Sequence, residues 1–111
     1  MTLNGNNIRK LDITAKNDLN LNLTINNDSS LTTLIVSGFV NVTINNCPLL
    51  TSIISNDEKL NKIEVTNCTQ VNSVSLNVKN CSYIRLNKTS LDDFKLRSSS
   101  NFDSISTLLI P

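Results

Sequence analysis

The chain has 111 residues, ten Lys and Arg against nine Asp and Glu, and neither His nor Trp. The length predicts a single domain, residues 1–111, and the absence of His excludes an imidazole base, the Ser-His-Asp and Cys-His pairs and the usual zinc site. The near-zero net charge gives no electrostatic basis for binding nucleic acid or an acidic membrane.

Small polar residues dominate the composition and predict an all-β fold. Asn is the most frequent residue type, Ser and Thr are also abundant, and Ala occurs only once, at Ala15. Because Asn, Ser and Thr compete with the helical backbone for hydrogen bonds, helices are disfavoured. Leu, Ile and Val are too numerous for a disordered chain of such low net charge.

The first ten residues are too polar for a signal peptide, and no apolar run reaches membrane-spanning length. We therefore expect synthesis in a cytoplasm, or export by another route, without membrane insertion. Residues 1–7 are interpreted as a polar N-terminal cap, 8–107 as repeats and 108–111 as an apolar C-terminal tail.

An apolar-x-x-apolar-x-apolar unit recurs along the chain in two interleaved series. The first series begins at positions 18, 39, 60, 81 and 102, with a constant step of 21. Its members are Asp18-x-x-Leu21-x-Leu23, Phe39-x-x-Val42-x-Ile44, Leu60-x-x-Ile63-x-Val65, Cys81-x-x-Ile84-x-Leu86 and Phe102-x-x-Ile105-x-Thr107. The second series is less regular, with steps of 23, 19, 21 and 20 between its first members Ile8, Leu31, Leu50, Val71 and Leu91.

The period-two alternation within each unit is typical of a strand with one buried face. One coil of two strands cannot bury its apolar side chains alone, whereas stacked coils pair strand on strand at about 4.8 Å. We predict a short parallel β-solenoid of about five coils, with polar corners such as 26–30, 56–59 and 98–101. A helix over 49–65 is the alternative, but Asp57 and Glu58 interrupt its apolar face.

Two units extend into a longer motif that resembles a known family. Leu60-x-x-Ile63-x-Val65-x-x-Cys68 and Phe39-x-x-Val42-x-Ile44-x-x-Cys47 resemble the leucine-rich-repeat signature, and the doubled unit is similar to short repeats of bacterial surface leucine-rich proteins. The resemblance implies a curved or flat scaffold that binds by surface contact. Other residues stand at the Asn/Cys position in further repeats, so a generic β-solenoid is the alternative: Thr89, Ile110, Lys79 and Ser99.

Cys47 and Cys68 fall one coil apart at the same repeat position, where two small inward hydrophobes are the favoured interpretation and a thiol pair or soft-metal site is the alternative. With Cys81 the number of cysteines is odd, which argues against a disulfide framework. Asn46 and Asn67 are expected to stack as a ladder that satisfies turn amides. We expect no catalytic, cofactor-binding or metal site, since a narrow solenoid offers no pocket.

Outward positions supply the candidate contact residues. The first patch combines an aromatic ring with charged groups, and Tyr and Arg are frequent contact residues at interfaces. The alternative is an ordinary outer sheet face with no binding role. The members of this patch are Tyr83, Arg85, Lys62 and Glu64, with Ser104 and Ser106 expected as outward neighbours. On the other face Ile35 and Ile54 are expected to be apolar neighbours. The tail, Leu108, Leu109, Ile110 and Pro111, either caps its own solenoid or docks on another subunit.

These features favour a non-catalytic structural or assembly protein that acts through a protein partner or self-association. A virus particle (a decoration or fibre protein) is one setting, because the Asn-, Ile-, Lys- and Ser-rich usage fits an AT-rich genome. The alternative is a recognition or adhesion module whose Tyr83/Arg85 face binds a peptide or glycan on a host surface. An enzyme ranks third.

Overall fold

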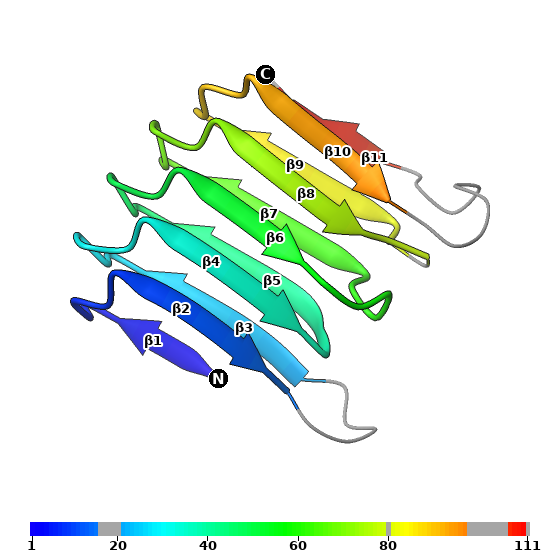
Figure 1. The fold of residues 1–111 in the computed structure, drawn as a ribbon, viewed down its shortest axis with the longest axis horizontal. Coiled ribbons are helices and arrows are strands. Elements are labelled where there is room, and N and C mark those ends of the chain that lie inside the picture. Colours follow the sequence, from blue (N-terminus) through cyan, green and yellow to red (C-terminus); the bar gives the residue numbers. More distant parts are fainter. Residues whose placement is uncertain (16–20, 80, 98–106, 111) are drawn as a thin grey trace.

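The computed structural model describes residues 1–15, 21–79, 81–97 and 107–110. It is a parallel β-solenoid of two stacked sheets, a six-stranded sheet in the order β1-β3-β5-β7-β9-β11 and a five-stranded sheet in the order β10-β8-β6-β4-β2 (Figure 1). The regular secondary structure of these described residues consists of strands alone. None of them forms a helix that could span a membrane. The predicted all-β solenoid is confirmed, and the alternative helix over 49–65 is wrong.

Successive strands alternate between the two sheets, so each coil gives one strand to each. The six-stranded sheet consists of β1 (Thr2–Asn4), β3 (Leu21–Asn26), β5 (Phe39–Asn45), β7 (Lys62–Thr66), β9 (Tyr83–Asn87) and β11 (Thr107–Leu109). The five-stranded sheet consists of β2 (Lys10–Thr14), β4 (Thr33–Ser37), β6 (Ser52–Ser55), β8 (Ser73–Asn77) and β10 (Asp93–Arg97).

The core is the thin apolar layer between the sheets. Within β7, Ile63 and Val65 are fully buried while Lys62 and Glu64 face outward, and the other central strands alternate in the same way. Each coil places its inward Leu, Ile and Val side chains on those of the next coil, and burial of one such side chain contributes about 1.5–3 kcal/mol. The core therefore depends on stacking, because no single coil encloses its own apolar residues.

The register of the five-stranded sheet agrees with the second sequence series at every step. Its inner row runs Leu11, Leu34, Ile53, Val74 and Phe94 across the five strands. The corners between successive strands differ in length, so the spacing of this series varies while its strands stay aligned.

The register of the six-stranded sheet agrees with the first series only in its middle. Val42, Ile63 and Ile84 align with the constant step that the sequence predicts. At the N-terminal side Leu23, not Leu21, lies opposite Val42, so the step is shorter by two, with a bulge after Leu21. A slip of two residues keeps the same side chains inward, so the apolar pattern does not distinguish the two registers.

The register that the sequence predicts at the C-terminal end is also wrong, and here the strand is shifted by an odd number of residues. Leu108, not Ile105, lies opposite Ile84, and residues 98–106, including the predicted Ile105, Ser104 and Ser106, lie outside the described part of the chain. The shift turns Thr107 outward and brings the apolar Leu108 to the inner row. The two end strands are three residues long, and the solenoid has about four coils rather than the five expected.

One corner position of each coil has a left-handed backbone and forms a column. Gly5, Asn27, Asn46, Asn67 and Lys88 directly follow β1, β3, β5, β7 and β9, and all have φ between 56° and 68°. The backbone N–H of Asn46 donates to the oxygen of Thr66 (3.0 Å), and neighbouring coils repeat this bond. Asn46 and Asn67 thus occupy the same corner position of neighbouring coils, and Asn suits it because it tolerates positive φ better than most residues, while the ladder of side chains stays a prediction.

Lys88 is the least suited residue in this column, so Lys88→Gly should stabilise the fold. Relieving the left-handed strain at φ 58° is expected to raise the free energy of unfolding by about 0.5–1 kcal/mol in urea denaturation. Gln70→Gly, at an exposed corner position without positive φ, is the control and should destabilise the protein slightly. Equal effects of the two substitutions would contradict the strain argument.

Candidate contact surfaces

The structure brings Tyr83, Arg85, Lys62 and Glu64 together on the outer face of the six-stranded sheet, here called the β7–β9 patch. Lys62 lies opposite Tyr83 and Glu64 opposite Arg85 in the parallel register. The Lys62 Nζ is 5.0 Å from the centroid of the Tyr83 ring, and the Arg85 Nη1 is 3.7 Å from the Glu64 Oε2. Exposed contacts of this kind add little stability, but they hold the four side chains in one arrangement.

The neighbours of the β7–β9 patch differ from those expected. Thr107 and Leu109 lie beside Tyr83 and Arg85, in place of the predicted Ser104 and Ser106. The exposed Leu109 therefore continues the row that contains Glu64 and Arg85. An apolar side chain next to an ion pair makes this edge of the sheet more suited to a protein contact than a pair of serines would be.

Ile35 and Ile54 lie opposite one another on the outer face of the five-stranded sheet, as the sequence indicated. Both are half-buried, between Asp12 on one side and Ser75 on the other. Their exposed apolar surface is therefore smaller than that of the chain ends.

The largest exposed apolar side chains lie mainly at the two ends of the solenoid. Leu108 and Leu109 are each 47% exposed and Ile110 is 40% exposed, although β11 pairs with the chain's own β9. Arg85, Asn87 and residues 108–110 line a hollow of about 520 Å³ where β11 stops short of the end of β9. Met1, at the opposite end, is 62% exposed, and the sequence analysis did not single it out.

Cys47 and Cys68 are buried in the position that follows the left-handed corner residue. The backbone N–H of Cys47 donates to the Cys68 sulfur (3.4 Å), and each thiol donates to a strand carbonyl of its own coil. The interaction with Cys47, together with burial, raises the pKa of Cys68, and burial raises the pKa of Cys81. Within the described residues no group of three or more His, Cys, Asp or Glu is placed to hold a metal ion.

The buried thiols should be unreactive in the folded protein. Cys47, Cys68 and Cys81 have no exposed surface, so an aromatic disulfide reagent at about pH 8 is expected to label none of them before unfolding and all three in urea. Mass spectrometry of the labelled chain counts the modified thiols. Rapid labelling under native conditions would show that the coils open readily at that position.

Asp28 occupies the same position one coil before Cys47, and the sequence analysis missed it as an individual residue. It is 2% exposed and its carboxylate accepts hydrogen bonds from the backbone N–H groups of Ser30 (2.9 Å), Leu31 (3.1 Å) and Ile8 (3.3 Å). The available signal was the Asn27-Asp28 pair, which matches Asn46-Cys47. Its role is structural, since it fastens the corner of one coil to the coil before it.

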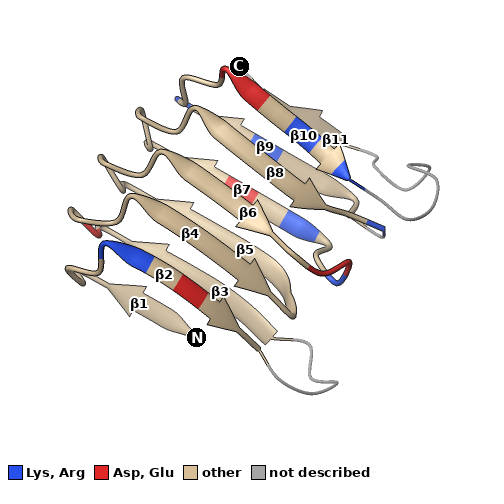
Figure 2. Cartoon of the chain, viewed as in Figure 1, with Lys and Arg blue, Asp and Glu red and all other residues tan. Residues whose placement is uncertain are grey.

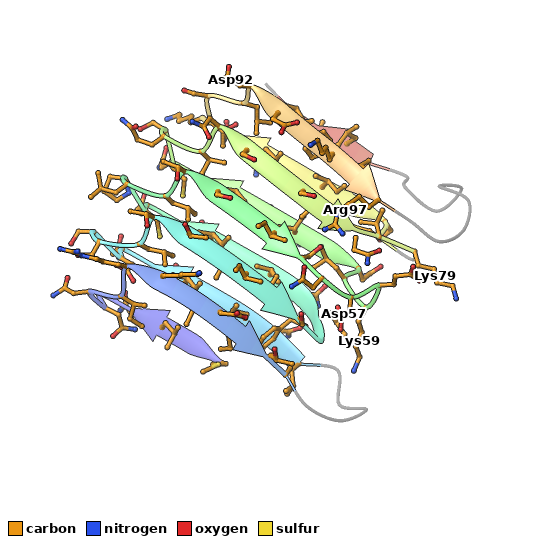
Figure 3. The ribbon with its side chains drawn as sticks, viewed as in Figure 1. Asp57, Lys59, Lys79, Asp92 and Arg97 are labelled. Atoms are coloured by element: carbon orange, nitrogen blue, oxygen red, sulfur yellow. The ribbon has the colours of Figure 1, made fainter. Side chains whose placement is uncertain are left out.

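Arg97 is a second residue that the sequence analysis missed. Its Nε donates to the Ser75 Oγ (2.8 Å) and its Nη2 to the Ser55 backbone oxygen (2.7 Å), so it crosses from β10 over β8 to β6 (Figure 3). The Ser55 Oγ in turn accepts the Asn77 N–H (2.8 Å). Arg97 therefore secures the last described strand of this sheet to the two coils before it.

Comparison of the chain with protein-family models, with curated proteins and with solved structures gives no match. The fold is a β-solenoid. The structure supports this coarser class, with a repeat spacing close to the one that the sequence predicts, and the leucine-rich-repeat resemblance rests on the motifs alone. Function is therefore inferred from the faces and ends of the solenoid.

Proposed function

We propose that this β-solenoid is a non-catalytic structural subunit that acts through protein–protein contacts. The observation that carries the proposal is the distribution of apolar surface. The layer between the sheets is filled by buried Leu, Ile and Val side chains, whereas Leu108, Leu109 and Ile110 are exposed at one end. Exposed apolar side chains gathered at one place are typical of interaction sites.

The shape fits a building block with flat sides. The chain measures 36 × 32 × 17 Å and presents two broad sheet faces and two ends. Charges on the described residues are of both signs and spread over several strands (Figure 2), which favours protein partners over nucleic acid. We propose a leucine-rich-repeat-like scaffold that is made in the cytoplasm. One setting for it is a virus particle, in which it would be a decoration or fibre protein.

A photo-crosslinking amino acid at Leu109 tests this proposal in the cells or particles that make the protein. We expect crosslinks from Leu109 to protein, detected as defined higher-mass bands, because its side chain is 47% exposed beside the hollow. Gln70, at an exposed corner away from both ends, is the control position and should give none. Equal yields from both positions, or none from either, would refute the proposed contact surface.

A recognition module is the second candidate, because the β7–β9 patch fixes the one described aromatic residue on an outer sheet face. Tyr83→Ala and Arg85→Ala should each weaken binding of a peptide or glycan at least about tenfold, since Tyr and Arg are frequent hot spots. Thr43→Ala, on the same face of the neighbouring β5, is the control. A ligand found by glycan or peptide array that binds all three variants equally would exclude the patch.

A further inference from the structure

In the two central rows of the outer face of the five-stranded sheet, charged residues occur only on the two edge strands. The outward residues of β4, β6 and β8 in the two central rows are uncharged: Thr33, Ile35, Ser52, Ile54, Ser73 and Ser75. The edge strand β2 carries Lys10 and Asp12 in these rows, and the opposite edge strand β10 carries Asp93 and Lys95 (Figure 2).

The two edges have opposite charges in three successive rows, whereas Arg97 of β10 shares its row with the uncharged Thr14 of β2. Following the register across the sheet, Lys10 shares a row with Asp93, and Asp12 shares a row with Lys95. Arg9 and Asp92 share the preceding row, which the backbone hydrogen bonds of Thr32, Thr51 and Asn72 connect. The segment Arg9-Lys10-x-Asp12 thus matches Asp92-Asp93-x-Lys95 with every sign reversed.

We propose that a second copy of this chain stacks head to tail, with its β2 paired in parallel along β10 of the first. This inference rests on the proposed structural function and names its partner. In the register used between the internal coils, the three charged rows become three pairs of opposite sign. On the inner side, Leu11 meets Phe94 and Ile13 meets Leu96, and all four are only partly buried in the single chain.

The six-stranded sheet has one strand more, and its end strand β11 already occupies part of the edge that β1 of the second copy would take in this register. β11 lies along Tyr83–Arg85, whereas β1 lies along Thr24–Asn26, which align with Arg85–Asn87 through β5 and β7. Leu109 of the first copy and Thr2 of the second copy would both lie beside Arg85, so stacking in this register requires one of the two short end strands to leave that position. β11 pairs with Tyr83–Arg85 only, and once the overlap at Arg85 is relieved β1 of the second copy would place Leu3 in the row of Leu86, beside the hollow at Asn87.

Charged edge strands also prevent unwanted pairing, and that is the competing explanation for the same residues. Edge protection requires charge but no match between the two ends, whereas stacking requires the signs to be complementary. A heterologous contact of this kind does not close on itself, so it generates open linear assemblies. The two explanations therefore differ in what an exchange of charge between the ends should do.

Reversing the charges at one end of the chain at a time distinguishes stacking from edge protection. The head-reversed variant carries Arg9→Asp, Lys10→Asp and Asp12→Lys; the tail-reversed variant carries Asp92→Lys, Asp93→Lys and Lys95→Asp. All six positions are exposed, and the tail variant keeps the Asp93–Lys95 ion pair (3.6 Å) with its polarity exchanged. The control, Glu58→Lys with Lys59→Glu, reverses two charges at the corner between β6 and β7, away from both ends of the solenoid and from the β7–β9 patch.

Sedimentation velocity at low salt measures the outcome. The native chain should associate with rising concentration, each reversed variant should associate about a hundredfold more weakly, and the control should behave as the native chain. Mixing the head-reversed and tail-reversed variants should restore association, because each altered end then meets its complement. Circular dichroism verifies that every variant keeps its β structure.

Three results would overturn the inference: a native chain that stays monomeric at every concentration, reversed variants that associate as the native chain does, or a mixture that stays monomeric. In the first case the charges serve edge protection alone. Crosslinks from Leu109 to a different protein would then still support the structural function, so failure of head-to-tail stacking and failure of the proposed function are distinguishable.

Discussion

Gly38→Ala should destabilise the protein by about 3 kcal/mol, a large part of the stability of a domain of this size. Gly38 is the single residue between β4 and β5, where the chain passes from one sheet to the other with φ 83°. A Cβ at this position would lie against the backbone oxygen of Ala15, which belongs to the coil below. The corner therefore combines left-handed strain with a close approach between coils.

Gly5→Ala separates the two contributions. Gly5 has φ 68°, but a Cβ there would meet nothing within 4 Å, so only the strain of about 1 kcal/mol applies. Urea denaturation followed by circular dichroism measures both variants. If both substitutions cost the same, the close packing of Gly38 on Ala15 contributes nothing to the stack.

Asp28→Ala is expected to cost about 3 kcal/mol, because three backbone N–H groups lose an acceptor carboxylate that is itself only 2% exposed. Leu31, one of the donors, has no exposed surface, and Ile8 belongs to the preceding coil. The substitution therefore loosens a corner and the attachment of the N-terminal coil together.

Two further variants give the comparison for Asp28. Asp28→Asn keeps an oxygen for Ser30 and Leu31 but turns an amide toward the N–H of Ile8, so it should cost about 1 kcal/mol. Asp57→Ala removes one corner bond of 3.4 Å to Lys59 from a half-exposed carboxylate and should cost about 0.5 kcal/mol. Thermal and urea unfolding that placed Asp28→Ala level with Asp57→Ala would contradict the role assigned to Asp28.

The sequence predicted the middle of the solenoid well because its strands and corners have the same period there. Phe39, Leu60 and Cys81 begin units that follow one another at a constant step of 21 and stay in one register, and this is where the β7–β9 patch lies. The patch could be predicted from the outward positions of two aligned units, before any contact between Lys62 and Tyr83 was known.

The ends could not be predicted from apolar spacing alone. Leu21, Leu23 and Ile25 alternate so regularly that a slip of two residues leaves the inward face unchanged. The left-handed corner residues mark the phase better, because the step from Asn27 to Asn46 equals the step from Leu23 to Val42 in the strand register. The residue types at the corners, in addition to the apolar pattern, are therefore needed to predict the register between successive coils.

Static light scattering of the unaltered chain over a range of concentrations tests most directly whether this solenoid acts by stacking on itself. We expect the mass to rise above 12.2 kDa in multiples of the single chain as concentration increases, and to fall again when salt screens the charged rows. A mass of 12.2 kDa at every concentration and salt level would contradict head-to-tail assembly.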